Sequence, residues 1–113
     1  MPENSECTVI KPSSDVRVLV LEGTPRERGE THGETLKSMI SEAIEAWKRD
    51  LEKSTGMNPD EYVAQFVDET DLLSAVKKWT PHLLEEVEGI GEGAKVDFNT
   101  IFAWQCADEE WWY

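Results

Sequence analysis

The stretch "GTPRERGETHG", residues 23–33, has the composition of a junction between a strand and a helix. It follows the aliphatic run "VRVLVL" of residues 16–21, which predicts a strand that is covered on both faces or lies at a sheet edge. Thr24 suits the N-cap, Pro25 suits the first helical position, and Glu27 completes a T-x-x-E capping box. We therefore predict a tight glycine turn followed directly by a helix.

Beyond this junction, apolar residues recur at helical spacing from Leu36 to Leu51, with Glu, Lys and Arg between them. The pattern predicts one long amphipathic helix over residues 25–54, ended by "STG". Gly29 and Gly33 lie four residues apart in its first turns, where each glycine costs about 1 kcal/mol relative to alanine. Because this spacing removes side chains from one stripe, we expect another backbone or a strand to pack very close.

Most of the remaining chain is also predicted to be helical. The segments "NPDE", residues 58–61, and "TPHL", residues 80–83, each place a capping side chain before a helix-starting proline. The first of these helices is expected to break or bend near "DETD", residues 68–71. The glycines of "GIGEGAKVD", residues 89–97, suit a helix C-terminus and a close turn, and Asp97 can cap a last helix. One strand cannot form a sheet alone, so the fold is expected to be incomplete.

The charge and cysteine content exclude several classes of partner. A net charge of -13, from 24 acidic and 11 basic residues, makes nucleic acid and anionic membranes poor partners. Cys7 and Cys106 have neither CxxC nor Cys/His ligand spacing, and no apolar run approaches the roughly 20 residues that span a bilayer. We expect a reduced, cytoplasmic protein with no metal or cofactor, in which residues 1–15 form a flexible tail and residues 16–113 belong to a single domain.

Few residues in the chain can carry chemistry. His32 and His82 are the only imidazoles, and we interpret His32 as a structural hydrogen-bonding group near the glycine-lined contact and His82 as solvent-facing. Cys106 is a candidate nucleophile, but a buried structural cysteine is the commoner role where no histidine is adjacent in sequence. The carboxylate runs "EGE" and "DEE" are interpreted as solvated faces. The aromatic residues 111–113 are too apolar to be left in water, so we expect them to form either a contact covered by a partner or part of a substrate pocket.

Two separated blocks of the sequence match the motifs of one enzyme family. The first block is "GTPRERGETHG", which is similar to G-T-P-x-x-x-G-x-x-H-G. The second is "EEVEGIGEGAKVD", which is similar to E-E-I-x-G-I-A-x-G-A with Gly91 in place of the usual alanine. The matched positions are Gly23, Thr24, Pro25, Gly29, His32, Gly33, Glu85, Glu86, Gly89, Ile90, Gly93 and Ala94. In these blocks, their order and their separation, the chain resembles the α subunit of the acyl-coenzyme A:6-aminopenicillanic acid acyltransferase family, the C45 group of N-terminal nucleophile hydrolases.

The resemblance implies an α+β fold. This mostly helical chain, with its one N-terminal strand, would complete a four-layer αββα sandwich with a partner β chain, and its glycine-bearing helix face would pack on the sheet. Family members cut themselves just before a cysteine, which becomes the first residue of the β chain and the nucleophile. The resemblance therefore implies an amidohydrolase or acyltransferase that acts on a small amide or thioester through an acyl-cysteine intermediate, with no catalytic residue in this chain.

The family's next block, L-N-x-R-x-E, corresponds to "WQCADEE". Glu109 matches, whereas Gln105 and Ala107 replace the Asn and the Arg. By this resemblance, Glu109, Trp111 and Trp112 are the expected edge of the substrate pocket or the contact with the β chain.

Two other interpretations remain open. The chain could be a non-enzymatic, acidic helical module whose acidic faces and aromatic cluster dock another protein. It could also be a cysteine enzyme that uses Cys106, an interpretation that retained activity after Cys106→Ala would dismiss. The family interpretation is distinguished by its prediction that the gene continues in frame to a cysteine followed by a strand-rich sequence.

Overall fold

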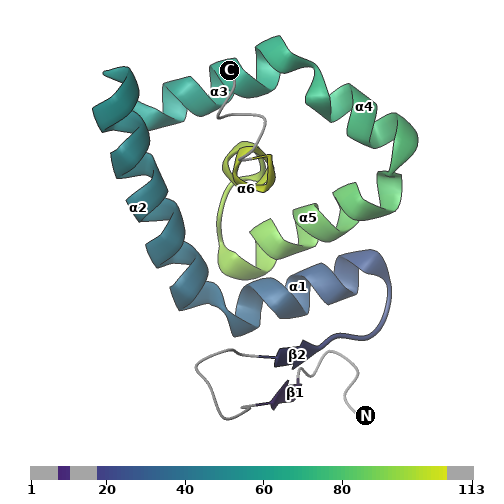
Figure 1. The fold of residues 1–113 in the computed structure, drawn as a ribbon. Coiled ribbons are helices and arrows are strands. Elements are labelled where there is room, and N and C mark those ends of the chain that lie inside the picture. The colour runs from purple at the N-terminus through teal and green to yellow at the C-terminus, as the bar shows by residue number, and fades with distance from the viewer. Residues whose placement is uncertain (1–7, 11–17, 107–113) are drawn as a thin grey trace.

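The computed structural model describes residues 8–10 and 18–106, and helices make up most of this part of the chain (Figure 1). Its elements are β1 (Thr8–Ile10), β2 (Val18–Val20), α1 (Pro25–Thr35), α2 (Lys37–Thr55), α3 (Pro59–Thr70), α4 (Leu72–Trp79), α5 (Pro81–Ala94) and α6 (Phe98–Gln105). Helices α2 to α5 form a frame around α6, and α1 lies between α5 and the two strands (Figure 1). The prediction of a mostly helical chain with an N-terminal strand is confirmed.

The two strands pair as an antiparallel two-stranded sheet. β2 lies inside the strand predicted over residues 16–21, whereas β1 lies within residues 1–15, for which the sequence predicts a tail. All three residues of β1 are β-branched, a composition that favours extended backbone beside a partner strand. Val18 and Val20 are 40% and 43% exposed, so β2 presents apolar side chains on an open face of this sheet.

The capping box that starts α1 is confirmed. The Thr24 hydroxyl accepts a hydrogen bond from the Glu27 N–H at 3.2 Å, and the Glu27 carboxylate accepts one from the Thr24 N–H at 2.9 Å. Gly23 supplies the turn before it with a φ of 104°. In contrast, the prediction of one long helix is wrong, because Leu36 separates α1 from α2. The two helices point in different directions. α1 packs alongside α5, whereas α2 turns away to form one side of the frame around α6 (Figure 1).

Of the other three predicted side-chain caps, two form. The Asn58 side chain accepts hydrogen bonds at the start of α3, and the Asp97 carboxylate accepts the Thr100 N–H at 3.1 Å at the start of α6. Thr80 does not cap α5, because its hydroxyl donates back to the carbonyl of Val76 in α4 at 3.3 Å. The predicted break between α3 and α4 is confirmed and is made by residue 71 in the left-handed region.

The predicted helix end within residues 89–97 is confirmed, but the glycines themselves do not make it. These glycines lie inside α5, which continues to Ala94 and ends at Lys95, a residue with a φ of 63°. The sequence signal was misleading because glycine both ends helices and lets them pack closely. In α5, Gly89 and Gly93 allow close packing and do not end the helix.

A stabilising substitution follows from the left-handed backbone at Lys95. A non-glycine residue in this region carries a cost of about 1 kcal/mol that glycine avoids, partly offset by the larger entropy of glycine in the unfolded chain. We expect Lys95→Gly to raise the free energy of unfolding by about 0.5 kcal/mol, measured by urea denaturation. Lys53→Gly, within α2, is the matched control and should lower it by about 1 kcal/mol. A loss of stability in Lys95→Gly would contradict the assigned helix end.

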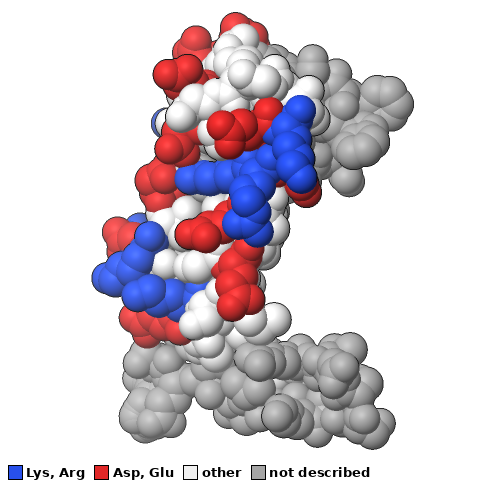
Figure 2. Space-filling model, turned by 90° about the vertical axis from the view of Figure 1, so that its left-hand side faces the viewer, with Lys and Arg blue, Asp and Glu red and all other residues white. Residues whose placement is uncertain are grey.

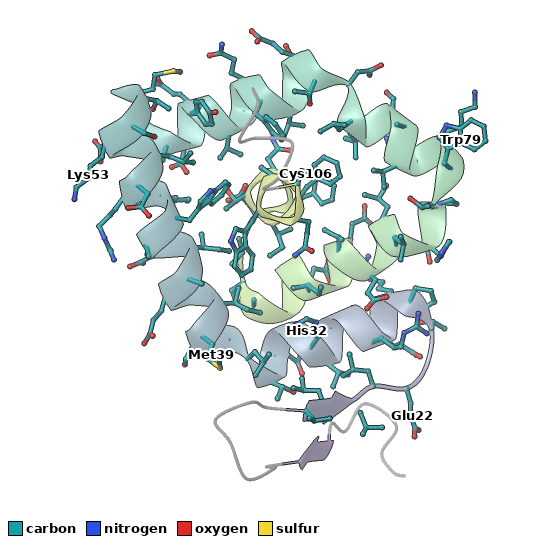
Figure 3. The ribbon with its side chains drawn as sticks, viewed as in Figure 1. Glu22, His32, Met39, Lys53, Trp79 and Cys106 are labelled. Carbon is teal, nitrogen blue, oxygen red and sulfur yellow. The ribbon has the colours of Figure 1, made fainter. Side chains whose placement is uncertain are left out.

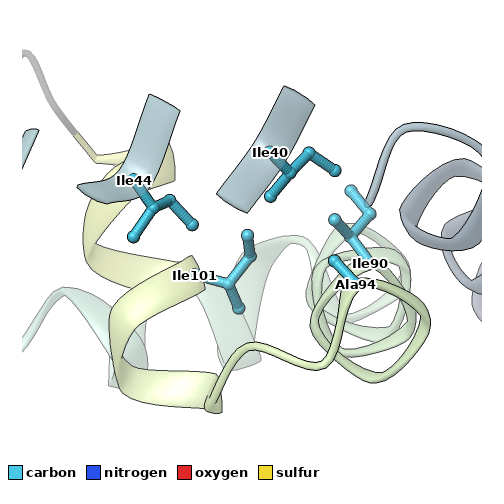
Figure 4. Close-up of a cluster of buried hydrophobic side chains, with 5 residues drawn as sticks. All are labelled: Ile40, Ile44, Ile90, Ala94 and Ile101. Atoms are coloured by element: carbon cyan, nitrogen blue, oxygen red, sulfur yellow. The ribbon is translucent and has the colours of Figure 1, made fainter. Parts of the chain in front are cut away.

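The core consists of two clusters on either side of α6. The first joins α2, α5 and α6 and contains Ile40, Ile44, Ile90, Ala94 and Ile101 (Figure 4). The second joins α2, α3 and α6 and contains Leu51, Tyr62, Val63, Phe66 and Ala103. Because α6 contributes to both clusters, it is the element that ties the frame together.

On the side of the molecule formed by α2, acidic and basic side chains are interspersed (Figure 2). One pair on this side joins two helices, with Lys48 of α2 at 2.8 Å from Asp60 of α3. Among the helices of the described residues, none has the length and apolar character needed to cross a membrane.

Candidate functional site

The glycines of the two motif blocks face one another along α1 and α5. A Cβ atom built on Gly29 would collide with the carbonyl oxygen of Glu86, and one built on Gly33 would collide with that of Ile90. The relation is reciprocal, since Cβ atoms on Gly89 and Gly93 of α5 would collide with backbone oxygens of α1. We call this contact the glycine joint; its four members are Gly29, Gly33, Gly89 and Gly93.

The glycine joint packs helix against helix. The expectation from the resemblance was that the glycine face of the first helix would lie on a sheet, and this is wrong for the described residues, because α5 occupies that face. The expectation of a very close backbone contact is confirmed. Two glycines spaced four apart on each helix remove the side chains from one stripe over more than a turn, and the two bare stripes meet.

Ion pairs line the edge of the glycine joint. The Arg26 guanidinium of α1 lies 3.3 Å from Glu30 in its own helix, 3.6 Å from Glu88 in α5, and also pairs with Glu92 in α5. The hydrogen bond and charge of Glu92, with a smaller contribution from Glu30, raise the pKa of Arg26. A second arginine, Arg28, pairs with a carboxylate of the second motif block, Glu86, at 3.5 Å. These partly exposed pairs fix which residues of α1 and α5 lie opposite one another, although each contributes little to stability.

His32 lies on α1 (Figure 3) and is half-buried. It borders an apolar hollow of about 310 Å³. Met39, Ala43 and Trp104 also line it, and we call it the His32 hollow. His32 is thus next in sequence to Gly33 of the glycine joint, but it borders the His32 hollow instead of the contact between α1 and α5. The prediction that His82 faces solvent is confirmed.

A second hollow, of about 320 Å³, lies between α4, α5 and α6. Its walls are mostly apolar and come from Val76, Leu83, Val87, Ile90 and Phe102. The polar atoms around it belong to Thr80, Glu86, Gln105 and Cys106. We call it the α4–α6 hollow. The sequence pattern did not predict this hollow; the available signal was the strong apolar stripe of α4, none of whose residues is buried.

Within the described residues, the candidate thiol and imidazoles do not share a hollow. Cys106 borders the α4–α6 hollow and His32 borders the other, so neither hollow combines a thiol with an imidazole. Over residues 8–10 and 18–106, no three His, Cys, Asp or Glu side chains are placed to hold a metal ion. The predicted pocket residues Glu109, Trp111 and Trp112 lie outside the described residues.

Comparison of the chain with family models, with curated proteins and with solved structures gives no match. The candidate site is therefore defined by geometry alone: a glycine joint formed by two sequence blocks, and two apolar hollows that share Ile90 and Gln105.

Proposed function

We propose that this chain is the α subunit of a self-processing amidohydrolase or acyltransferase. It acts with a β chain cut from the same precursor, whose first residue is the nucleophilic cysteine. That residue's own α-amino group serves as the base, and the acyl group of a small amide or thioester passes through an acyl-cysteine intermediate. This chain contributes the helical frame, and donors on the β chain stabilise the oxyanion.

The observation that carries the proposal is the glycine joint. The two blocks on which the family resemblance rests are far apart in sequence, and in the structure they interlock through their glycines. Glu86, another motif position, adds an ion pair to Arg28 across the same contact. Because residues of both blocks meet at one tight contact, the two blocks together support a framework in common with that family better than either block does alone.

The exposed valines of β2 support a partner that supplies further strands. A two-stranded sheet is at best marginally stable unless more strands or a helix cover it. In this chain α1 lies along the sheet, while Val18 and Val20 stay open to solvent. A sheet of the β chain is the cover we propose, and Glu109, Trp111 and Trp112 are the proposed pocket edge or subunit contact.

The test is intact mass spectrometry of the complete gene product under denaturing conditions, with N-terminal sequencing of each chain. We expect two chains, of which the second begins with cysteine. Replacing that cysteine with alanine should leave one uncut precursor, because the nucleophile for cleavage is lost. The matched control is Cys106→Ala, which should be cut like the unaltered precursor. A single uncut chain in the unaltered protein would contradict the proposal.

One observation favours the alternative of a non-enzymatic interaction module. At the corner between α4 and α5, Trp79 is 72% exposed and Leu83 is 49% exposed. Large exposed apolar side chains, tryptophan above all, are typical of contact sites for other proteins. The same mass spectrometry separates the two functions, since a binding module requires no cleavage before a cysteine.

A further inference from the structure

We infer that the α4–α6 hollow is a binding site for an uncharged alkyl compound of medium length with one hydrogen-bonding head group. The first argument is the incomplete burial of α4. Its apolar stripe is strong, yet Val76, the α4 residue that lines the hollow, is only half-buried, so this part of the helix faces a space that the described residues leave unfilled. An apolar occupant would complete the burial of this stripe.

The size and walls of the hollow select the ligand's tail. Three helices border it on the side away from solvent, and its volume of about 320 Å³ lies at the lower end of the range for small-molecule sites. At roughly 30 Å³ for each water-sized group, this space holds about ten non-hydrogen atoms. Leu83, Val87 and Phe102 offer only hydrocarbon to these atoms. A chain of about eight carbons therefore fits.

The charges and polar atoms around the hollow select the head group. Glu86 borders the hollow while its carboxylate pairs with Arg28 at 3.5 Å, and the whole chain has a net charge of -13. A carboxylate head would lose solvation and meet repulsion here. Gln105 lies on the border with an amide that can both donate and accept, which suits an alcohol or an amide.

Cys106 provides a reporter inside the site, because its thiol borders the hollow. In a Cys7→Ser background, the rate of labelling of Cys106 by a disulfide reagent is measured with 1-octanol or octanoate, which share a tail and differ in head charge. We expect 1-octanol to slow labelling about fivefold near saturation and octanoate to slow it less than about twofold. In parallel, the α4 amides should exchange hydrogen more slowly with 1-octanol, a readout independent of the thiol.

Two variants test the location of the ligand. Leu83→Trp places a larger side chain at the half-exposed wall of the hollow and should abolish the effect of 1-octanol. Ala43→Trp is the matched control, because it fills the His32 hollow instead and should leave the effect intact. The proposal is overturned if 1-octanol changes neither the labelling rate nor the exchange of α4. It is equally overturned if octanoate binds as well, or if Leu83→Trp leaves the effect unchanged. Because no step requires a cleaved precursor, these results are independent of the proposed enzymatic function.

Discussion

Replacing Gly33 with alanine is expected to lower the free energy of unfolding by about 3 kcal/mol. The added Cβ would collide with the carbonyl oxygen of Ile90 and the backbone nitrogen of Ala94 in α5, neither of which can rotate away as a side chain could. The helices would have to move apart, and the ion pairs of Arg26 with α5 would be lost. At an open helical position the same change would add about 1 kcal/mol of stability, so the sign of the effect is diagnostic.

Urea denaturation followed by far-UV circular dichroism measures this change. Gly91→Ala is the matched control, because Gly91 also lies in α5 but outside the glycine joint. Its added Cβ would lie 3.0 Å from the carbonyl oxygen of Val96 and 3.1 Å from a side-chain methyl of Ile101, contacts that small shifts can relieve. We expect it to cost about 1 kcal/mol. If Gly33→Ala proved as stable as the unaltered chain, the close contact of α1 with α5 would be refuted.

The glycine joint shows what the sequence could and could not predict. The spacing of Gly29 and Gly33 predicts that a backbone approaches closely, because that consequence is local to one helix. It does not identify the approaching element, since only the tertiary fold places α5 there. The α5 glycines were assigned to a helix end for the same reason: without the partner helix, glycine near a helix end is most simply interpreted as a terminator.

The break at Leu36 and the two hollows were not predicted, for different reasons. The apolar periodicity begins only at Leu36, since residues 25–35 contain no Val, Ile, Leu, Met or Phe, and nothing in it gives the direction of α2 relative to α1. The α4–α6 hollow depends on how far α4 stands from α6, and the His32 hollow on how α1 and α2 stand relative to α5 and α6, placements that no single helix encodes. Caps at Thr24 and Asp97 were predictable because each involves a side chain and a backbone group three residues away.

Truncation of Ile101 to alanine is expected to cost about 4 kcal/mol of the free energy of unfolding. Its side chain is completely buried in α6 and packs between α2 and α5, as the cluster with Ile40, Ile44 and Ile90 shows (Figure 4). Removing most of that side chain at the centre of the frame leaves a cavity. The surrounding helices can close it only partly, since α6 is also held by the second cluster through Ala103.

The graded variant Ile101→Val should cost only about 1 kcal/mol, because one methyl group is lost and the branch at Cβ is kept. Trp79→Ala, at a position 72% exposed, is the surface control and should change stability by less than about 0.5 kcal/mol. Calorimetric unfolding of the three variants gives the comparison. A loss for Ile101→Ala no greater than that for Ile101→Val would mean that α6 does not fill the centre of the frame. A loss near 4 kcal/mol, with cooperative unfolding retained, would show that the clusters on both sides of α6 belong to one folding unit.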